Sequence, residues 1–336
     1  MKALVTGGGG FLGRHIVYKL LQTGTSVRVM GRREYPALKD MGVDCFTGDI
    51  SDRDSVMQAC KGMDLIYHVA AIPGIWGKWD TFYNTNYIGS KNVLEACEKL
   101  GIPRLIYTSS PSVIFDGSSM ENVDETYPYP KEFDCYYPKT KAMAEKMILE
   151  ANGKKGVYTT SIRPHLIWGP GDNHLIPRFL KKGKAGRIRQ VGDGQNLVDT
   201  VYVENAAIAH LQVAEKLEKD SPVAGQAYFI SQDEPIKLWE WINRFLLGAN
   251  IPAIKGKISA NTAYYAGMFL EGVYSILGLS GEPPMTRFLA SELAKSHWYN
   301  ISKAKKDFGY EVKVDTEEGY KLLFASPYFK ELVANL

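Results

Sequence analysis

The chain has 336 residues, 45% of them hydrophobic and 23% charged, which is ordinary for a globular protein with one large domain or two unequal ones. Its net charge of +3 is too small to indicate nucleic-acid binding, because basic residues are mixed with acidic ones except at 178–189. The four cysteines and six histidines show no Cys-x-x-Cys or His-x-x-x-His spacing, so we expect neither a disulfide framework nor a metal site.

Short apolar runs alternate with helix-period stretches from the first residues to about residue 165. The apolar runs are 2–6, 26–30, 64–70, 104–110 and 157–164. Because the first run leads directly into a turn, it leaves no room for an export signal, and we expect a cytoplasmic location. Strands separated by helices are typical of right-handed crossover units. The pattern therefore predicts an α/β fold with a doubly wound parallel sheet.

The alternation weakens after residue 165, beginning with Gly-Pro-Gly at 169–171. We expect 1–165, joined by about 199–224, to form the first domain. The remaining segments, 166–198 and 225–336, would form a smaller mixed C-terminal domain that closes over a substrate.

The stretch 259–281 is uncharged except for Glu271. Each apolar half has only about 10 to 12 residues, which is too short to span a membrane. We expect core or domain packing, with peripheral contact to a membrane surface, or a lid over an apolar substrate, as the alternatives.

A glycine-rich turn, VTGGGGFLG, follows the first strand and opens the first helix, where Phe11 and Leu12 lie. Gly7, Gly10 and Gly13 suit a tight turn in which a pyrophosphate approaches the backbone closely. The free amides at the helix start would bind the phosphates. The first domain is therefore predicted to be a dinucleotide-binding Rossmann domain.

The end of the second strand bears on the cofactor. Gly31 stands where a carboxylate would accept from a ribose 2′-hydroxyl, and Arg32 and Arg33 follow it. Arginines can bind a 2′-phosphate, so we expect NADP(H), with NAD(H) possible if both are merely exposed loop residues. Asp49, with Ile50 beside it, could accept from the adenine amino group or could cap the next helix.

Five Tyr-x-x-x-Lys pairs occur, and Tyr137 with Lys141 is the one that combines a helix start with a preceding strand ending in hydroxyls, Ser109 and Ser110. Open parallel sheets bind ligands at this edge. A lysine one turn away would lower the pKa of the phenol, so that Tyr137 could exchange a proton with a substrate oxygen. Ser110 would hydrogen-bond the same oxygen, and Lys141 could also reach the nicotinamide ribose.

Several motifs in order resemble the extended short-chain dehydrogenase/reductases. They are TGGGGFLG, GDISD, DLIYHVAA, YTSSPSV, the Tyr137/Lys141 pair, IRPHLIWGPGD and VDTVYVENAA. The tail at 283–312 is similar to the 3β-hydroxysteroid dehydrogenase branch, which includes sterol 4-carboxylate 3-dehydrogenases and bacterial reductases of 2-alkyl-3-keto acids. The resemblance implies a homodimer formed through helices near 84–100 and 137–152.

The resemblance also implies roles for individual residues. Catalysis would fall to Ser110, Tyr137 and Lys141, supported by Asn86, and Ser109 or Ser112 are weaker substitutes for Ser110. The cofactor would lie against Ala70, Ala71 and the backbone from Pro164 to Leu166. His68 and His165 fall near the nicotinamide end and could touch substrate.

Taken together, these features predict an NAD(P)-dependent oxidoreductase for a keto or secondary hydroxyl group of a large hydrophobic substrate, such as a 3-keto acid or a sterol. One alternative is a nucleotide-sugar epimerase or dehydratase. Such relatives usually carry an arginine before the aspartate that matches Asp199, where this chain has Val198, although Arg178, Lys181 or Arg187 could compensate. The other alternative, a non-catalytic NADPH sensor, would often lack the tyrosine or the lysine.

Overall fold

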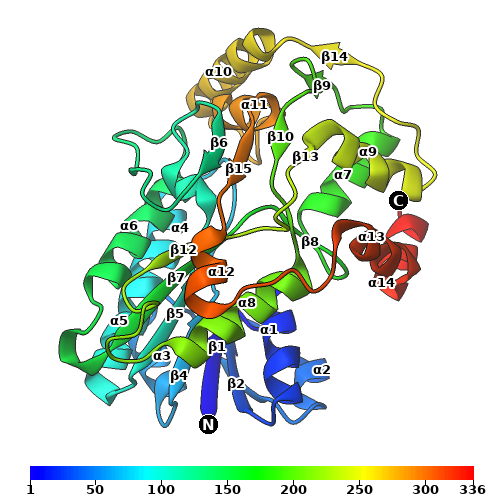
Figure 1. The fold of residues 1–336 in the computed structure, drawn as a ribbon. Helices are drawn as coiled ribbons and strands as arrows, with labels where there is room; N and C mark the ends of the chain where they lie inside the picture. Colours follow the sequence, from blue (N-terminus) through cyan, green and yellow to red (C-terminus); the bar gives the residue numbers. More distant parts are fainter.

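The computed structural model describes all residues, 1–336, and its centre is a sheet of seven parallel strands (Figure 1). The strands are β1 (Lys2–Thr6), β2 (Ser26–Gly31), β3 (Asp44–Thr47), β4 (Leu65–His68), β5 (Arg104–Thr108), β7 (Tyr158–Pro164) and β12 (Ala227–Ile230). Their spatial order is β12-β7-β5-β4-β1-β2-β3, so the chain reverses its direction of winding at β1 and β4. The predicted doubly wound α/β fold is confirmed.

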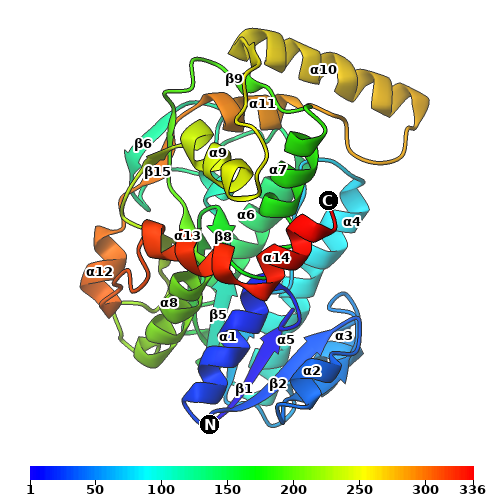
Figure 2. The ribbon, with the colours of Figure 1, turned by 90° about the vertical axis from the view of Figure 1, so that its right-hand side faces the viewer.

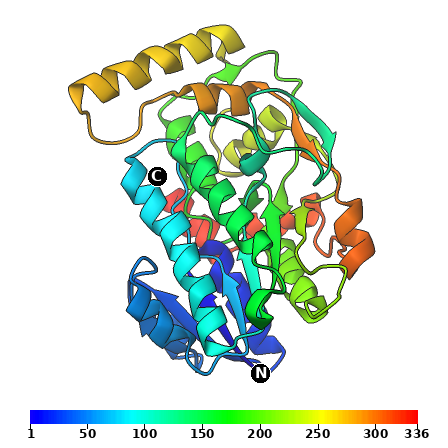
Figure 3. The same cartoon turned by 90° about the vertical axis from the view of Figure 1, so that its left-hand side faces the viewer.

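Helices cover both faces of this sheet because each buries one apolar stripe against it. One face carries α1 (Phe11–Gln22), α8 (Val203–Lys216) and α12 (Ser302–Phe308), which share a core of 37 buried residues with the strands. The other face carries α3 (Arg53–Cys60), α5 (Gly89–Leu100) and α6 (Tyr136–Glu150), with a core of 18 buried residues. Figure 3 shows α5 and α6 side by side on the second face.

Strand β12 lies beyond residue 224, where the sequence-based boundary ends the first domain. It nevertheless pairs in parallel with β7, with Ala227 opposite Ser161. The segment Tyr299–Tyr310, which includes α12, also packs on the first core. The chain therefore returns to the seven-stranded sheet twice after residue 165. The sequence pattern did not predict the return of β12, because β12 is an apolar run of four residues in a stretch without regular alternation.

The remaining elements build a smaller mixed region above the carboxyl edge of the large sheet (Figure 1). Its own sheet has the order β13-β10-β15-β6, and its core of 19 buried residues is centred on Trp168, Trp241 and Phe245. The strands are β6 (Met120–Val123), β8 (Ile167–Trp168), β9 (Gln190–Val191), β10 (Leu197–Val198), β11 (Val201–Tyr202), β13 (Ile236–Lys237), β14 (Lys257–Ile258) and β15 (His297–Tyr299). The helices are α7 (Leu175–Lys184), α9 (Leu238–Gly248), α10 (Ala260–Leu277), α11 (Arg287–Ala294), α13 (Thr316–Ala325) and α14 (Pro327–Ala334).

Short helical segments complete the chain. They are α2 (Pro36–Lys39), α4 (Trp79–Phe82), the π-helical turn η1 (Tyr83–Ile88), and the 3-10 turns η2 (Pro111–Ile114) and η3 (Lys154–Gly156). The π turn continues directly into α5, so residues 79–100 form one uninterrupted helical stretch with a local widening.

Helix α10 projects from the C-terminal region (Figure 2). It packs on the start of α11 through its two buried residues, Ala263 and Gly267, and a Cβ at Gly267 would lie 2.6 Å from the carbonyl carbon of Thr286. The bulky side chains face outward, with Phe269 70% and Ile276 85% exposed. The expectation of core or domain packing is confirmed for the side of α10 that contacts α11 and is wrong for its outward side. No helix of the chain is both long and apolar enough to cross a membrane.

Candidate active site

The glycine turn lies where the carboxyl ends of β1 and β4 meet. Gly7 has a φ of +69°, and a Cβ there would lie 2.9 Å from the Cα of Ala70. A Cβ at Gly13 would lie 2.3 Å from the carbonyl oxygen of Gly7. Gly10 precedes α1 and provides no side-chain cap, so the backbone amides at the start of this helix remain free. Phe11 and the buried Leu12 are the first residues of the helix. This bare backbone fits a dinucleotide pyrophosphate.

A buried chain of hydrogen bonds holds the segment after β4. The hydroxyl of Thr6 lies 2.7 Å from Nδ1 of His68, and Nε2 of His68 lies 2.8 Å from the hydroxyl of Ser90. Ser90 in turn donates to the carbonyl oxygen of Asn86 at 2.6 Å. His68 is fully buried, and this burial lowers its pKa to about 3. The interpretation of His68 as a substrate contact is therefore wrong, and its role is structural.

Asn86 lies on the π turn and joins three segments. Its Oδ1 accepts from the amide of Ile72 at 2.8 Å, and its Nδ2 donates to the carbonyl of Ile72 at 3.1 Å and to the hydroxyl of Thr140 at 3.2 Å. Thr140 lies between Tyr137 and Lys141 on α6. Asn86 therefore fixes α6 relative to the segment that includes Ala70 and Ala71.

Ser110 and Tyr137 face each other from the end of β5 and the start of α6. Ser110 caps the 3-10 turn η2, and its hydroxyl lies 2.9 Å from that of Ser112. Burial raises the pKa of Tyr137 to about 12, and hydrogen bonding with Ser110 opposes this rise. Ser109 is buried, and Ser110 is the hydroxyl whose hydrogen bond affects the pKa of the phenol.

Lys141 is 2% exposed, and its ammonium donates to the carbonyl oxygen of Thr108 at 2.6 Å. It also lies 4.1 Å from the centre of the Tyr107 ring. Burial lowers the pKa of Lys141 to about 7, while the charge of Glu145 acts in the opposite direction. In this arrangement the ammonium is directed at the end of β5, and the effect of Lys141 on the pKa of Tyr137 stays a prediction.

An ion pair that sequence reasoning missed supports α6, the helix that carries Tyr137 and Lys141, on the side that faces β7. The carboxylate of Glu145 accepts from the guanidinium of Arg163 at 2.6 and 3.0 Å, and both side chains are buried. Tyr129 and Ser161 donate to the same carboxylate at 2.7 Å each. Two features of the sequence could have indicated this pair: Glu145 follows Lys141 by one helical turn, and Arg163 is a charged residue within an apolar strand.

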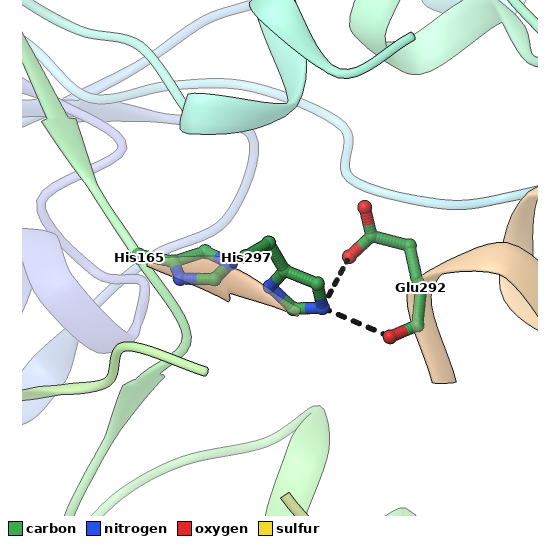
Figure 4. A group of neighbouring side chains, drawn as sticks. All are labelled: His165, Glu292 and His297. Atoms are coloured by element: carbon green, nitrogen blue, oxygen red, sulfur yellow. Dashed lines mark hydrogen bonds and ion pairs between the residues drawn. The ribbon is translucent and has the colours of Figure 1, made fainter. Parts of the chain in front are cut away.

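The end of β7 is the predicted carboxamide site. Pro164 and His165 are buried, and Leu166 has a φ of +40°, a conformation that non-glycine residues rarely adopt. Figure 4 shows His165 beside His297 of β15, which donates from Nε2 to the carbonyl oxygen of Glu292 at 2.9 Å. Burial lowers the pKa of His165 well below its usual value, so its ring is neutral.

His165, Glu292 and His297 form the one group of potential metal ligands in the chain, with one donor atom from each lying within 4.8 Å of the others. Nδ1 of each histidine is buried and has no hydrogen-bond partner. Two imidazoles and a carboxylate are a donor set that Zn²⁺ accepts. Burial raises the pKa of Glu292, however, which favours the protonated carboxyl over a ligand charge.

Arg32 and Arg33 are exposed beyond the end of β2, and neither forms an ion pair within the chain. Asp49 accepts from the amide and hydroxyl of Ser51 at 2.8 and 2.7 Å, which lowers its pKa. The cap of α3 is Asp52, so the interpretation of Asp49 as that cap is wrong. Ile50 is buried against Gly89.

A pocket of 330 Å³ opens beside the start of α6, where Pro138 lines it, and α10 and α11 form part of its wall. Its lining combines the rings of Phe115, Phe133, Tyr264 and Phe288 with the carboxylates of Asp116, Glu132 and Asp134. A second pocket of 670 Å³ lies against the C-terminus and contains no predicted site residue. Val198 is fully buried in the second core, and Arg178 is paired with Glu282.

The fold, together with the family match and the relatives given next, identifies the chain as an NAD(P)-dependent oxidoreductase of the extended short-chain dehydrogenase/reductase class, acting on CH-OH groups. Residues 4–253 match the 3-beta hydroxysteroid dehydrogenase/isomerase family. The chain belongs to this family.

Individual relatives agree with this assignment. The 2-alkyl-3-oxoalkanoate reductase of Stenotrophomonas maltophilia is 44% identical over 328 residues, which cover 97% of this chain and 99% of the relative. The decarboxylating sterol-4-alpha-carboxylate 3-dehydrogenase of Mus musculus is 36% identical over 321 residues, covering 94% and 88%. The solved UDP-glucose 4-epimerase of Thermotoga maritima shares the fold with a TM-score of 0.76 at 22% identity, covering 98% and 99%.

Proposed function

We propose that this protein is an NADP(H)-dependent oxidoreductase acting on a 3-oxo or 3-hydroxy group of a large apolar substrate, such as a 3-keto acid or a sterol carboxylate. The observation that supports the proposal is the hydrogen bond between Ser110 and Tyr137, with the buried Lys141 one turn further along α6. The names of the two relatives, a 2-alkyl-3-oxoalkanoate reductase and a sterol-4-alpha-carboxylate 3-dehydrogenase, support this substrate class.

Tyr137 would carry the proton of the reacting oxygen. With a pKa raised to about 12, the side chain remains a phenol at neutral pH, and a phenol is the form that donates during reduction. Ser110 would bind the same oxygen and hold it in line with the phenol. The buried ammonium of Lys141 would stabilise the phenolate that forms as the proton leaves. The nicotinamide, when bound, supplies or accepts the hydride.

The cofactor would lie across the carboxyl edge of the large sheet. The amides at the start of α1 would bind the pyrophosphate, and Arg32 and Arg33 would favour a 2′-phosphate because both are free of ion pairs. Ala70, Ala71 and the backbone from Pro164 to Leu166 would line the nicotinamide half.

The second region, 166–198 with 225–336, would close over the substrate in the aromatic pocket beside α6. We also propose a homodimer through the exposed sides of the helices at 84–100 and 137–152. The outward face of α10 would lie against a membrane surface, where apolar substrates of this kind collect.

The decisive experiment measures NADPH oxidation with 2-alkyl-3-keto acids and keto steroids, and it measures conversion of nucleotide sugars by product analysis, because epimerisation consumes no NADPH net. We expect turnover of an apolar ketone, lowered at least about 100-fold by Tyr137→Phe, because general-acid catalysis is lost. The matched control is Tyr136→Phe, which removes a hydroxyl from the adjacent, 45% exposed tyrosine. Turnover of a nucleotide sugar alone would establish the epimerase alternative, and tight NADPH binding without turnover of any substrate would establish the sensor.

A further inference from the structure

The side chain of Tyr35 lies directly on two glycines of the cofactor groove. A Cβ at Gly9, within the glycine turn, would lie 1.9 Å from Cε1 of the Tyr35 ring. A Cβ at Gly31, at the end of β2, would lie 2.3 Å from the Tyr35 hydroxyl oxygen. Real Cβ contacts at these distances do not occur, so any side chain at either position would displace the ring. The phenol thus occupies the place of a side chain at position 31.

The backbone of Tyr35 is held firmly. Its carbonyl oxygen accepts from the amides of Leu38 and Lys39 at 3.0 Å each, and Pro36 begins the short helix α2. The thiol of Cys45 approaches the same carbonyl at 4.0 Å. All these contacts use the main chain, so the phenol hydroxyl has no partner within the protein and can bind a ligand.

The charges around the hydroxyl suit an anion. Arg32 and Arg33 precede Tyr35 and form no ion pair, whereas Glu34 is engaged by Lys39 at 3.8 Å. Asp49 is the nearby acid, and the charge of Arg32 contributes to lowering the pKa of its carboxyl. A free phenol therefore lies at the position where a ribose-binding carboxylate stands in NAD-type sites, and two arginines without ion pairs precede it in the sequence.

We propose that Tyr35 determines cofactor specificity. Its hydroxyl donates a hydrogen bond to the 2′-phosphate of NADP(H), and its ring excludes an acidic side chain at position 31 that would select NAD(H). The inference rests on the NADP(H) preference proposed above and adds a residue that glycine-motif reasoning does not reveal. Gly31 is then required for space rather than for backbone conformation, since its φ is not positive.

The test compares dissociation constants for NADPH and NADH by fluorescence titration. Tyr35→Phe should weaken NADPH binding about 10-fold and leave NADH binding within about 2-fold, as expected for one lost hydrogen bond to a charged group. Tyr18→Phe, which removes a hydroxyl from a half-buried tyrosine of α1, serves as the matched control and should change neither constant.

A second pair of variants tests the steric part. Gly31→Asp should weaken binding of both cofactors, and Gly31→Asp with Tyr35→Ala should bind NADH at least about 10-fold more tightly than Gly31→Asp alone. Thermal unfolding of each variant separates lost binding from lost folding.

Three outcomes overturn the proposal or its basis, and they can be told apart. An unchanged NADPH constant in Tyr35→Phe refutes the hydrogen bond. Strong NADH binding by Gly31→Asp alone refutes the steric exclusion. A wild-type protein that binds NADH more tightly than NADPH refutes the cofactor preference itself, and the Gly31→Asp pair then still decides whether the ring fills position 31.

Discussion

The buried ion pair between Glu145 and Arg163 shows how a single residue pair can support the catalytic helix. It joins α6, which carries Tyr137 and Lys141, to β7, which ends at the predicted carboxamide site. Four donors hydrogen-bond the Glu145 carboxylate, so its charge is fully paired. Burial alone would raise the pKa of this carboxyl, yet Arg163 and Tyr129 keep it below its usual value.

Removing one partner should therefore be costly. We expect Arg163→Met to lower the free energy of unfolding by about 3–5 kcal/mol, because it leaves Glu145 charged and buried. Urea denaturation measures this change. Arg53→Met, which breaks a largely exposed pair with Glu95 at 3.0 Å, should cost less than about 1 kcal/mol. If both variants lose a similar amount of unfolding free energy, the buried pair contributes no more to stability than the exposed one. Arg163→Met with Glu145→Leu should recover part of the lost stability.

Among the elements, α10 presents a surface that the rest of the chain leaves uncovered. Its outward residues Tyr265, Phe269 and Ile276 are spaced along one side, and its one charged residue, Glu271, is neutralised by Arg287 at 2.7 Å. An uncharged apolar helix face that is anchored by small residues on its inner side fits a lipid interface.

The vesicle-binding prediction follows from this face. Wild-type protein should co-sediment with phosphatidylcholine–phosphatidylglycerol vesicles, and Phe269→Asp with Ile276→Asp should reduce the bound fraction at least about 5-fold. Leu247→Asp places the same charge at a 56% exposed leucine of α9 and should have no effect. If no variant and no wild-type protein binds vesicles, and the double variant is monomeric where the wild type is a dimer, the outward face of α10 contacts a second copy of the chain instead.

Across the whole molecule, several histidines are buried as neutral rings. Nδ1 of His210 donates to the carbonyl oxygen of Ala206 at 2.7 Å, Nε2 accepts from the hydroxyl of Thr108 at 2.9 Å, and burial lowers the pKa of His210 to about 4. His68 has a pKa of about 3 for the same reason. The unfolded chain, with histidine pKa values near 6.5, binds more protons than the folded chain below that pH.

Stability should therefore fall as the pH drops below about 6.5, by about 1.4 kcal/mol per pH unit for each histidine until its folded-state pKa is reached. Urea midpoints at pH 7, 5.5 and 4.5 measure this slope. His210→Gln should reduce the slope, whereas His174→Gln, at an exposed histidine, should leave it unchanged. An equal slope in all three proteins would assign the acid sensitivity to other groups.

The sequence predicted those features that depend on local pattern. Strand and helix alternation predicted the doubly wound sheet, and the glycine spacing predicted a tight turn after β1, where Gly7 has a φ of +69°. It could not predict the direction of the Lys141 ammonium, because that depends on a carbonyl from β5, which only the folded sheet brings near. The pairing of β12 with β7 and the grouping of His165 with His297 were missed for the same reason.

The return of β12 and α12 to the large sheet has a consequence for recombination between relatives. A chimaera with one crossover point near residue 165 or 224 would combine β7 of one parent with β12 of the other. A crossover near residue 224 would also combine α8 of one parent with α12 of the other, and these helices share one core. Exchange of substrate range by block transfer therefore needs at least two inserted segments with matched β12 and α12 surfaces. The order in which the chain returns to the large sheet therefore limits how the C-terminal region can be exchanged between relatives during evolution, independently of the chemistry of the pocket.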